Sequence, residues 1–227
     1  FIGGGVHVRD AKQEDPTQSS NGIPLYKRFE NGNIYDSEKK RMSVFGFTAT
    51  SGSTIEFWMK KNGFNSTNTQ KEVLIDIWNG QASSSANYGR ITLEMSASTN
   101  GLDPFRFTYQ SGTVGTFQQS LTDNTFTTAS IADGQWHHYA LTTMARITGS
   151  DTFLDLKFYR DGVVLKEQSI STGATILGNL YGRPDAHIGA LIGSPSGSTG
   201  QKYAGKLSAS VDEIRFWKKR LSSREIN

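Results

Sequence analysis

Two adjacent histidines, His137 and His138, are the residues best suited to acid–base or metal chemistry. They follow Trp136 in an alternating stretch that predicts a strand, so their side chains point to opposite faces of one sheet. The two rings therefore cannot reach the same ligand. We expect each histidine to have a structural role, with its ring hydrogen-bonded within the fold. Trp136 starts this strand directly after a turn, and we expect its indole to fill the space between two sheets.

The sequence lacks residues that several other chemistries need. It contains no cysteine, which excludes disulfides, thiolate nucleophiles and cysteine-ligated metals. It contains no G-x-S-x-G elbow and no H-E-x-x-H motif, and Gly3–Gly5 precede a strand-like stretch rather than the helix of a phosphate-binding loop. These absences argue against the common nucleophilic, zinc-dependent and nucleotide-dependent enzymes.

Three aromatic side chains are candidates for ligand contact: Trp58, Trp78 and Tyr159. Each alternates with core-facing neighbours, so we expect each ring to point outward from its sheet. Flat rings stack on the apolar faces of sugars, and neighbouring polar side chains bind the hydroxyl groups. The alternative for each ring is burial against another subunit or a loop, and the sequence leaves both open.

Short segments in which apolar and polar residues alternate must position these candidate residues. One of them is 54–60, where Ile55, Phe57 and Met59 share a face. The same period of two recurs along the chain, in 73–78, 91–95, 105–109 and 154–159. We therefore predict an all-β fold, a two-sheet antiparallel jelly-roll sandwich with a short C-terminal helix.

Turn and cap signals divide these strands. Asn62-Gly63 and Asp161-Gly162 predict tight hairpins, because both positions of a type I′ turn need positive φ. Ser222 and Glu225 predict a capping box at the start of the C-terminal helix.

We predict one sandwich domain over residues 35–227, preceded by an N-terminal extension or linker, residues 1–34, that carries the first strand or strands.

The charge and the apolar pattern of the sequence argue against nucleic acid as a partner and against a segment that spans a membrane. The 227 residues carry a net charge of +3. The basic residues near the end are too sparse for the stripe that nucleic-acid binding needs. These are Arg215, Lys218, Lys219, Arg220 and Arg224. No apolar run approaches the roughly 20 residues that span a bilayer. Because the chain starts with Phe1, we expect a piece of a longer or processed protein.

Four segments in order carry a resemblance to a known family. They are Ser53–Lys60, Asp133–Thr142, Leu156–Leu165, and His187–Ala190 followed by Gly205–Ile226. Their order and spacing resemble the laminin-G-like domains of the concanavalin A-like lectin/glucanase superfamily, and the same elements recur in pentraxin-type domains. The resemblance covers roughly Tyr35 to Asn227. It implies a fold that hosts lectins, adhesion modules, hydrolases and virion components.

The resemblance also implies a metal ligand on the last long strand. In related sandwiches an acidic residue there helps to hold a structural Ca²⁺ with backbone carbonyls, which makes Asp212 the candidate here. Calcium takes six to eight oxygens, so Asp212 needs further ligands around it. A salt bridge to a nearby arginine is an equal alternative. Val211, Ile214 and Trp217 break strict alternation, which predicts a β-bulge near Asp212-Glu213.

The resemblance offers a test for catalysis. Glucanases of the superfamily carry acidic residues at alternate positions of one strand, which places nucleophile and acid on one face. Here Glu56, Asp76 and Glu94 each stand alone in their strands, and Asp212 and Glu213 are adjacent and face opposite ways. We therefore predict a protein without enzymatic activity, and a polysaccharide hydrolase or lyase is the less favoured reading.

Two functions remain. The first is a non-catalytic carbohydrate-binding or adhesion module of a larger surface protein, whose partner is a glycan or cell-surface polysaccharide. The second is a structural or assembly domain of a virion or tail-fibre protein, which contacts other subunits and also host glycans. Both place the protein outside the cell or at a cell or virion surface.

Overall fold

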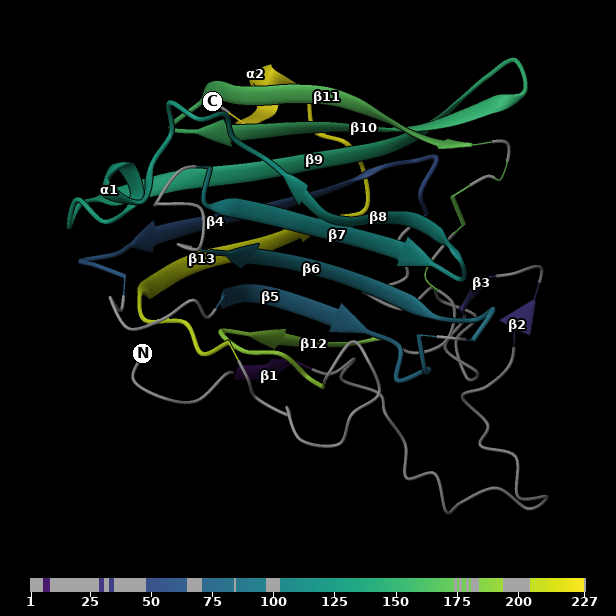
Figure 1. The fold of residues 1–227 in the computed structure, drawn as a ribbon, viewed down its shortest axis with the longest axis horizontal. Coiled ribbons are helices and arrows are strands. Elements are labelled where there is room, and N and C mark those ends of the chain that lie inside the picture. The colour runs from purple at the N-terminus through teal and green to yellow at the C-terminus, as the bar shows by residue number, and fades with distance from the viewer. Residues whose placement is uncertain are drawn as a thin grey trace.

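The computed structural model describes residues 6–8, 29–30, 33–34, 48–64, 71–83, 85–96, 103–173, 175, 177–178, 180, 184–193 and 205–226, with backbone alone before residue 48. Two antiparallel sheets face each other across one apolar core (Figure 1). This arrangement confirms the predicted two-sheet antiparallel sandwich. The predicted boundary between residues 34 and 35 lies outside the described residues.

Six strands form one sheet, in the order β1-β12-β5-β6-β7-β8. Their bounds are Val6–Val8 for β1, Asp185–Ile188 for β12, Glu72–Trp78 for β5, Gly89–Met95 for β6, Phe105–Ser111 for β7 and Val114–Ser120 for β8. A separate two-stranded sheet pairs β2 (Phe29–Glu30) with β3 (Asn33–Ile34).

Five strands form the other sheet, in the order β11-β10-β9-β4-β13. Their bounds are Val163–Gly173 for β11, Asp151–Arg160 for β10, Trp136–Thr148 for β9, Ser53–Lys60 for β4 and Ser210–Trp217 for β13. Two four-residue helices complete the described structure, α1 (Thr128–Ile131) and α2 (Ser223–Ile226). The second is the predicted C-terminal helix.

Aromatic rings join the two sheets in the core. Phe105 of β7 lies 4.7 Å from Phe158 of β10 and 5.3 Å from Tyr139 of β9, measured between ring centroids. Phe57 of β4 stacks on Tyr139 at 5.4 Å. These rings are fully buried, as the period of two predicts for Phe57, Phe105 and Phe158. Burial raises the pKa of the Tyr139 hydroxyl far above its usual value.

The C-terminal segment lies on the outer face of the five-stranded sheet. Leu221 and Ile226 pack against Ala140 and Tyr159 in a small cluster of their own. The capping box is confirmed in part, because the Ser222 N–H donates to the Glu225 carboxylate at 2.8 Å. The Ser222 hydroxyl also donates to this carboxylate, whereas the predicted box has the hydroxyl accept a backbone N–H.

The two predicted hairpins have different outcomes. Asp161 and Gly162 have φ of 49° and 76° and join β10 to β11, which confirms a type I′ turn. The Asn62-Gly63 prediction is wrong. β4 pairs with β9 and β13, not with the strand that follows it, so this pair lies in a longer connection. A type I′ turn joins only strands that pair directly.

Candidate functional site

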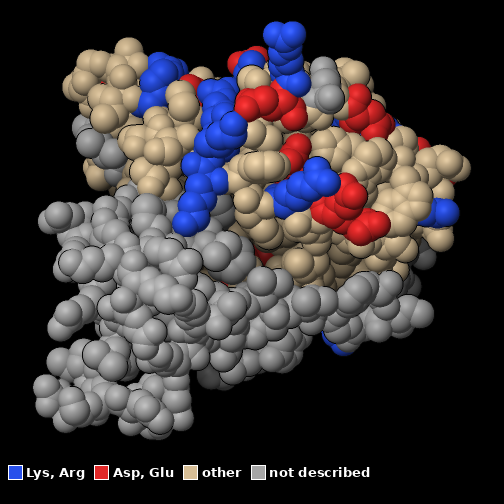
Figure 2. Space-filling model, turned by 180° about the vertical axis from the view of Figure 1, so that it is seen from behind, with Lys and Arg blue, Asp and Glu red and all other residues tan. Residues whose placement is uncertain are grey.

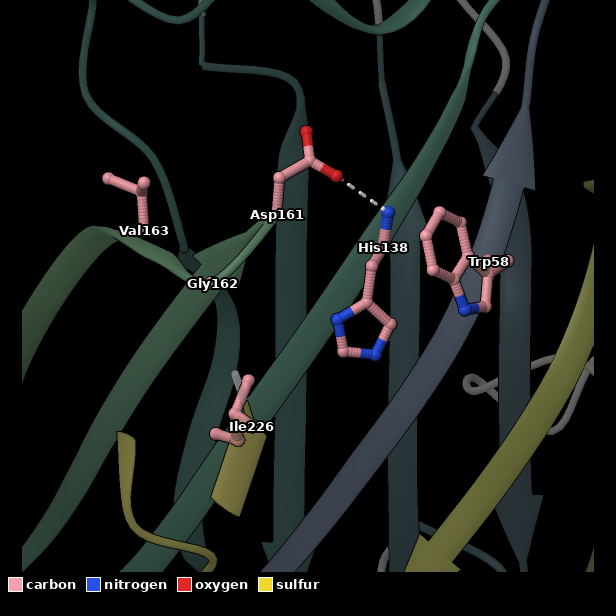
Figure 3. A pocket seen from close by; sticks show the side chains of 6 residues that line it. All are labelled: Trp58, His138, Asp161, Gly162, Val163 and Ile226. Carbon is pink, nitrogen blue, oxygen red and sulfur yellow. Dashed lines mark hydrogen bonds between the residues drawn. The ribbon is translucent and has the colours of Figure 1, made fainter. Parts of the chain in front are cut away.

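A shallow open hollow lies on the outer face of the five-stranded sheet, where β4 and β10 end and β9 and β11 begin. Its volume is about 580 Å³. Six residues line it: Trp58, His138, Asp161, Gly162, Val163 and Ile226. They come from β4, β9, the β10–β11 turn, the start of β11 and α2, so stretches far apart in the sequence meet here (Figure 3).

Trp58 forms one wall of the hollow. It is 38% exposed, although both of its strand neighbours, Phe57 and Met59, are buried in the core. The centroids of its ring and the His138 ring lie 5.4 Å apart, with the planes tilted by 43°. This confirms that the indole points outward and remains accessible, so a flat apolar surface faces solvent beside polar groups.

Asp161 and Trp58 lie on either side of His138, and the Asp161 carboxylate points toward the His138 backbone N–H (Figure 3). Its Oδ1 accepts the His138 backbone N–H at 2.9 Å, and its Oδ2 lies 2.6 Å from Nδ1 of His137. The carboxylate is fixed in direction and still 46% exposed, so it retains accessible lone pairs. A ligand in the hollow therefore meets a positioned hydrogen-bond acceptor.

The two histidines lie on opposite sides of β9, as predicted. His137 is held between Asp161 and Asp133, with Nε2 2.9 Å from Asp133 Oδ2, and the Arg160 guanidinium adjoins this ring. Burial acts to raise the pKa of Asp133, but hydrogen bonds from Gln135 and His137 and the charges of His137 and Arg160 lower it overall.

His138 reaches the hollow and lies above a buried carboxylate. Its Nε2 is 3.8 Å from Oε1 of Glu56, which is 5% exposed. The Trp217 indole N–H donates to Oε2 of the same residue. Glu56 therefore lies beneath the hollow, held from both sides.

The three aromatic candidates do not come together. Trp78 lies in the other sheet and is half-buried. Its indole N–H donates to the Gln81 carbonyl at 2.9 Å, and the Arg90 guanidinium lies 5.5 Å from its ring. Tyr159 is wrong as a ligand contact and the alternative of burial is confirmed, because this ring is 1% exposed beneath Leu221 and Ile226 and its hydroxyl bonds to Ser223 at 3.0 Å. Tyr159 supports the C-terminal segment and cannot contact a ligand.

The expected burial of Trp136 is also wrong. The ring is 44% exposed, because Trp136 is the first residue of β9 and pairs with Lys60 at the outer end of β4. Its even-numbered position places it on the same face as His138, away from the core.

Asp212 is exposed and lies opposite Trp58 in the β13–β4 pairing. Its Oδ1 accepts the Glu213 backbone N–H at 2.8 Å, and the nearby ion pair joins Arg215 to Glu213. The predicted bulge is confirmed by the register shift between Asp212 and Arg215. Among the described residues no cluster of three or more His, Asp or Glu side chains is placed to hold a metal, so the calcium site stays a prediction.

Sequence reasoning missed the five residues that line the hollow with Trp58. It assigned His138 a structural role and Asp161-Gly162 a turn, and it gave no role to Val163 or Ile226. The turn signal was present, but the register of β9 against β10 was needed to place it beside His138. No described helix is long and apolar enough to cross a bilayer.

No curated protein matches the sequence. Domains LG4-5 of the mouse laminin α1 chain match with 14% identity over 79% of this chain and 43% of theirs, at a TM-score of 0.45. The binding domain of botulinum neurotoxin serotype D matches with 11% identity over 86% and 38%, at a TM-score of 0.46. This chain thus spans less than half of either matched chain.

A third solved structure is the CBM40 of the Ruminococcus gnavus IT-sialidase, bound to α2,3-sialyllactose. It matches with 14% identity over 79% of this chain and 81% of its own, at a TM-score of 0.41. An alginate lyase from Corynebacterium sp. also matches, with 14% identity over 81% of this chain and 65% of its own, at a TM-score of 0.33. The family model described as "Concanavalin A-like lectin/glucanases superfamily", Laminin_G_3, matches residues 36–227. With its two antiparallel sheets and this match over most of its length, the chain belongs to the concanavalin A-like lectin/glucanase superfamily.

Proposed function

We propose that this domain is a non-catalytic carbohydrate-binding module of a larger extracellular or cell-surface protein. The observation that carries the proposal is the exposed face of Trp58 beside the directed carboxylate of Asp161 in one open hollow. An indole packs against the C–H face of a sugar ring, and a carboxylate accepts hydrogen bonds from its hydroxyl groups.

The carboxylates of the hollow support binding rather than hydrolysis. Glycoside hydrolysis uses two carboxyl groups that flank the scissile bond. Asp161 is the one acidic residue among those lining the hollow, and Glu56 is buried beneath it with Trp217 and His138 as neighbours. The hollow itself therefore holds one accessible carboxylate, and Asp212, which lies opposite Trp58 on β13, is not among its lining residues.

A glycan array probed with the chain tests this function, with Trp58→Ala as the decisive variant. We expect wild-type binding to a defined set of glycans and a loss of at least about tenfold in Trp58→Ala, or ~1.4 kcal/mol. Phe117→Ala is the matched control, since Phe117 is 57% exposed on the other sheet. Silence of the wild type on the array, or equal binding by Trp58→Ala, contradicts the proposal.

Assembly is the second candidate, and exposed apolar side chains away from the hollow favour it. Phe117 on β8 is 57% exposed and Ile147 at the end of β9 is 53% exposed. Such side chains are buried at the contacts between subunits. Light scattering of the purified chain is the test: a stable oligomer that Phe117→Ala or Ile147→Ala dissociates supports a structural role in a virion or surface fibre. A monomer at all concentrations contradicts it.

A further inference from the structure

The hollow lies in a row of side chains that crosses the five-stranded sheet. Asp212 of β13 pairs with Trp58 of β4, and Trp58 pairs with His138 of β9. The row continues to Asp161, whose backbone N–H donates to the His138 carbonyl at 2.8 Å. Directly opposed residues have Cβ atoms about 5 Å apart, so Trp58 has a carboxylate next to it on one side and another beyond His138.

A third carboxylate lies below this row. Glu56 is two residues before Trp58 on the same face of β4, and its side chain is almost fully buried. The indole N–H of Trp217 donates to it, the ring of His138 lies beside it, and Arg215 is opposite Glu56 in the β13–β4 pairing. The aromatic surface is therefore bordered by Asp161, Asp212 and Glu56.

Around the hollow, the described carboxylates outnumber the cations that pair with them. No lysine or arginine lines the hollow itself. Arg160 is shared by two carboxylates, Asp133 at 3.1 Å and Asp161 at 3.5 Å. Arg215 binds Glu213 at 2.8 Å, and Lys219 binds Glu225 at 2.6 Å. A sugar carboxylate or sulfate on Trp58 would thus meet acidic groups and no lining cation, although recognition of such groups relies on arginine or lysine.

The surrounding surface carries both signs of charge. Seen from behind, some Lys and Arg side chains stand together in one column, and elsewhere Lys and Arg stand among Asp and Glu over the described part of the molecule (Figure 2). A polyanionic glycan would be attracted by a continuous basic field, which steers and concentrates a charged ligand. Like charges placed together act against a partner, and this is a common source of specificity.

We propose that the hollow selects uncharged saccharides and rejects glycans that carry a carboxylate or sulfate at the residue lying on Trp58. This inference rests on the proposed carbohydrate-binding function and specifies its ligand class. Asp161 supplies acceptors for hydroxyl donors, and the same charge, with Asp212 and Glu56, repels an anionic sugar. The Trp58 ring contacts the apolar face of a sugar whether or not that sugar carries a charge.

Matched glycan pairs test the selectivity. An array carries acidic glycans, each beside its carboxyl-reduced neutral counterpart, and is probed in EDTA so that no divalent cation bridges the carboxylates. At low NaCl we expect the wild type to bind the neutral member at least about tenfold more tightly. High NaCl should change the binding of the neutral member little and should reduce the preference, because salt screens the repulsion of the acidic member. In Asp161→Asn and Asp212→Asn, the difference within each pair should shrink by several-fold.

The control variant is Asp151→Asn, which removes the same charge at the far end of β10. It should leave the preference unchanged. Equal or tighter wild-type binding of the acidic members at low NaCl overturns the selectivity and leaves glycan binding intact. Silence toward all glycans instead overturns the proposed function itself.

Discussion

His138 and Asp161 bind each other through two hydrogen bonds. The Asp161 backbone N–H donates to the His138 carbonyl at 2.8 Å, and the His138 backbone N–H donates to the Asp161 carboxylate at 2.9 Å. This reciprocal pair fastens the β10–β11 turn to β9. It sets the direction of the carboxylate before any ligand arrives, and a preorganised group loses less entropy on binding.

The reciprocal pair predicts a difference between two variants of Asp161. Asn keeps an acceptor for the His138 N–H and tolerates positive φ, so Asp161→Asn should retain the turn. Asp161→Ala removes the acceptor and puts a less tolerant residue at φ of 49°, so we expect it to be destabilised by about 1–3 kcal/mol. Urea unfolding measures both, and equal stabilities would contradict the role of the pair.

The buried ion pair between Asp76 and Arg90 predicts the largest loss of stability. Asp76 is fully buried and accepts bonds from Arg90, the Thr92 hydroxyl and the Ile192 backbone N–H. Burial acts to lower the pKa of Arg90, but the charge and hydrogen bonds of Asp76 raise it overall. Asp76→Ala leaves a buried cation without its partner, which should cost about 3–5 kcal/mol.

Equilibrium unfolding in urea tests this, with Glu213→Gln as the control. Glu213 pairs with Arg215 at the surface, and an exposed pair contributes at most about 1 kcal/mol. If Asp76→Ala were no less stable than Glu213→Gln, the buried pair would not stabilise the six-stranded sheet as the structure indicates.

Low pH should break the hydrogen bonds of the Glu225 carboxylate that cap the start of α2. Hydrogen bonds from Lys219 and Ser222 lower the pKa of Glu225 from 4.5 to about 2. Because the folded-state pKa is depressed, this contribution is complete above the unfolded value near 4.5 and is lost as the pH falls toward 2. An NMR titration of the Glu225 carboxyl carbon should give a midpoint near the lower value. A midpoint at the ordinary value contradicts the cap.

Calcium binding at Asp212 has a direct test. An ion held by Asp212 with backbone carbonyls would stabilise the folded chain by mass action. Millimolar calcium should then raise the melting temperature relative to EDTA, and Asp212→Asn should remove the rise. An identical melting temperature in calcium and EDTA contradicts the prediction.

The core could be predicted from the sequence because the alternation of apolar and polar residues within each strand shows which side chains face the core. Ile55, Phe57 and Met59 are buried as the period of two requires. The outer face is different, since what covers it comes from elsewhere in the chain. Tyr159 is buried by Leu221 and Ile226, more than sixty residues later, and nothing in its own strand signals that cover.

The hollow was only half predictable for a related reason. Trp58 and the Asp161-Gly162 turn each had a local signal, namely alternation and a type I′ turn pair. Their proximity depends on how β4, β9 and β10 are paired, and pairing is set by long-range packing. Ile226 enters through the docking of α2, which the capping box predicts as a helix but does not place.

The most direct test of the central claim is a titration of the indole N–H signals with a glycan that the array identifies. The chain has four tryptophans, so each is followed separately in a ¹H–¹⁵N spectrum. The account predicts that the Trp58 signal moves the most, together with the His138 and Gly162 amides, while Trp78 and Trp217 stay in place. Shifts centred on Trp78, with Trp58 unmoved, would contradict it.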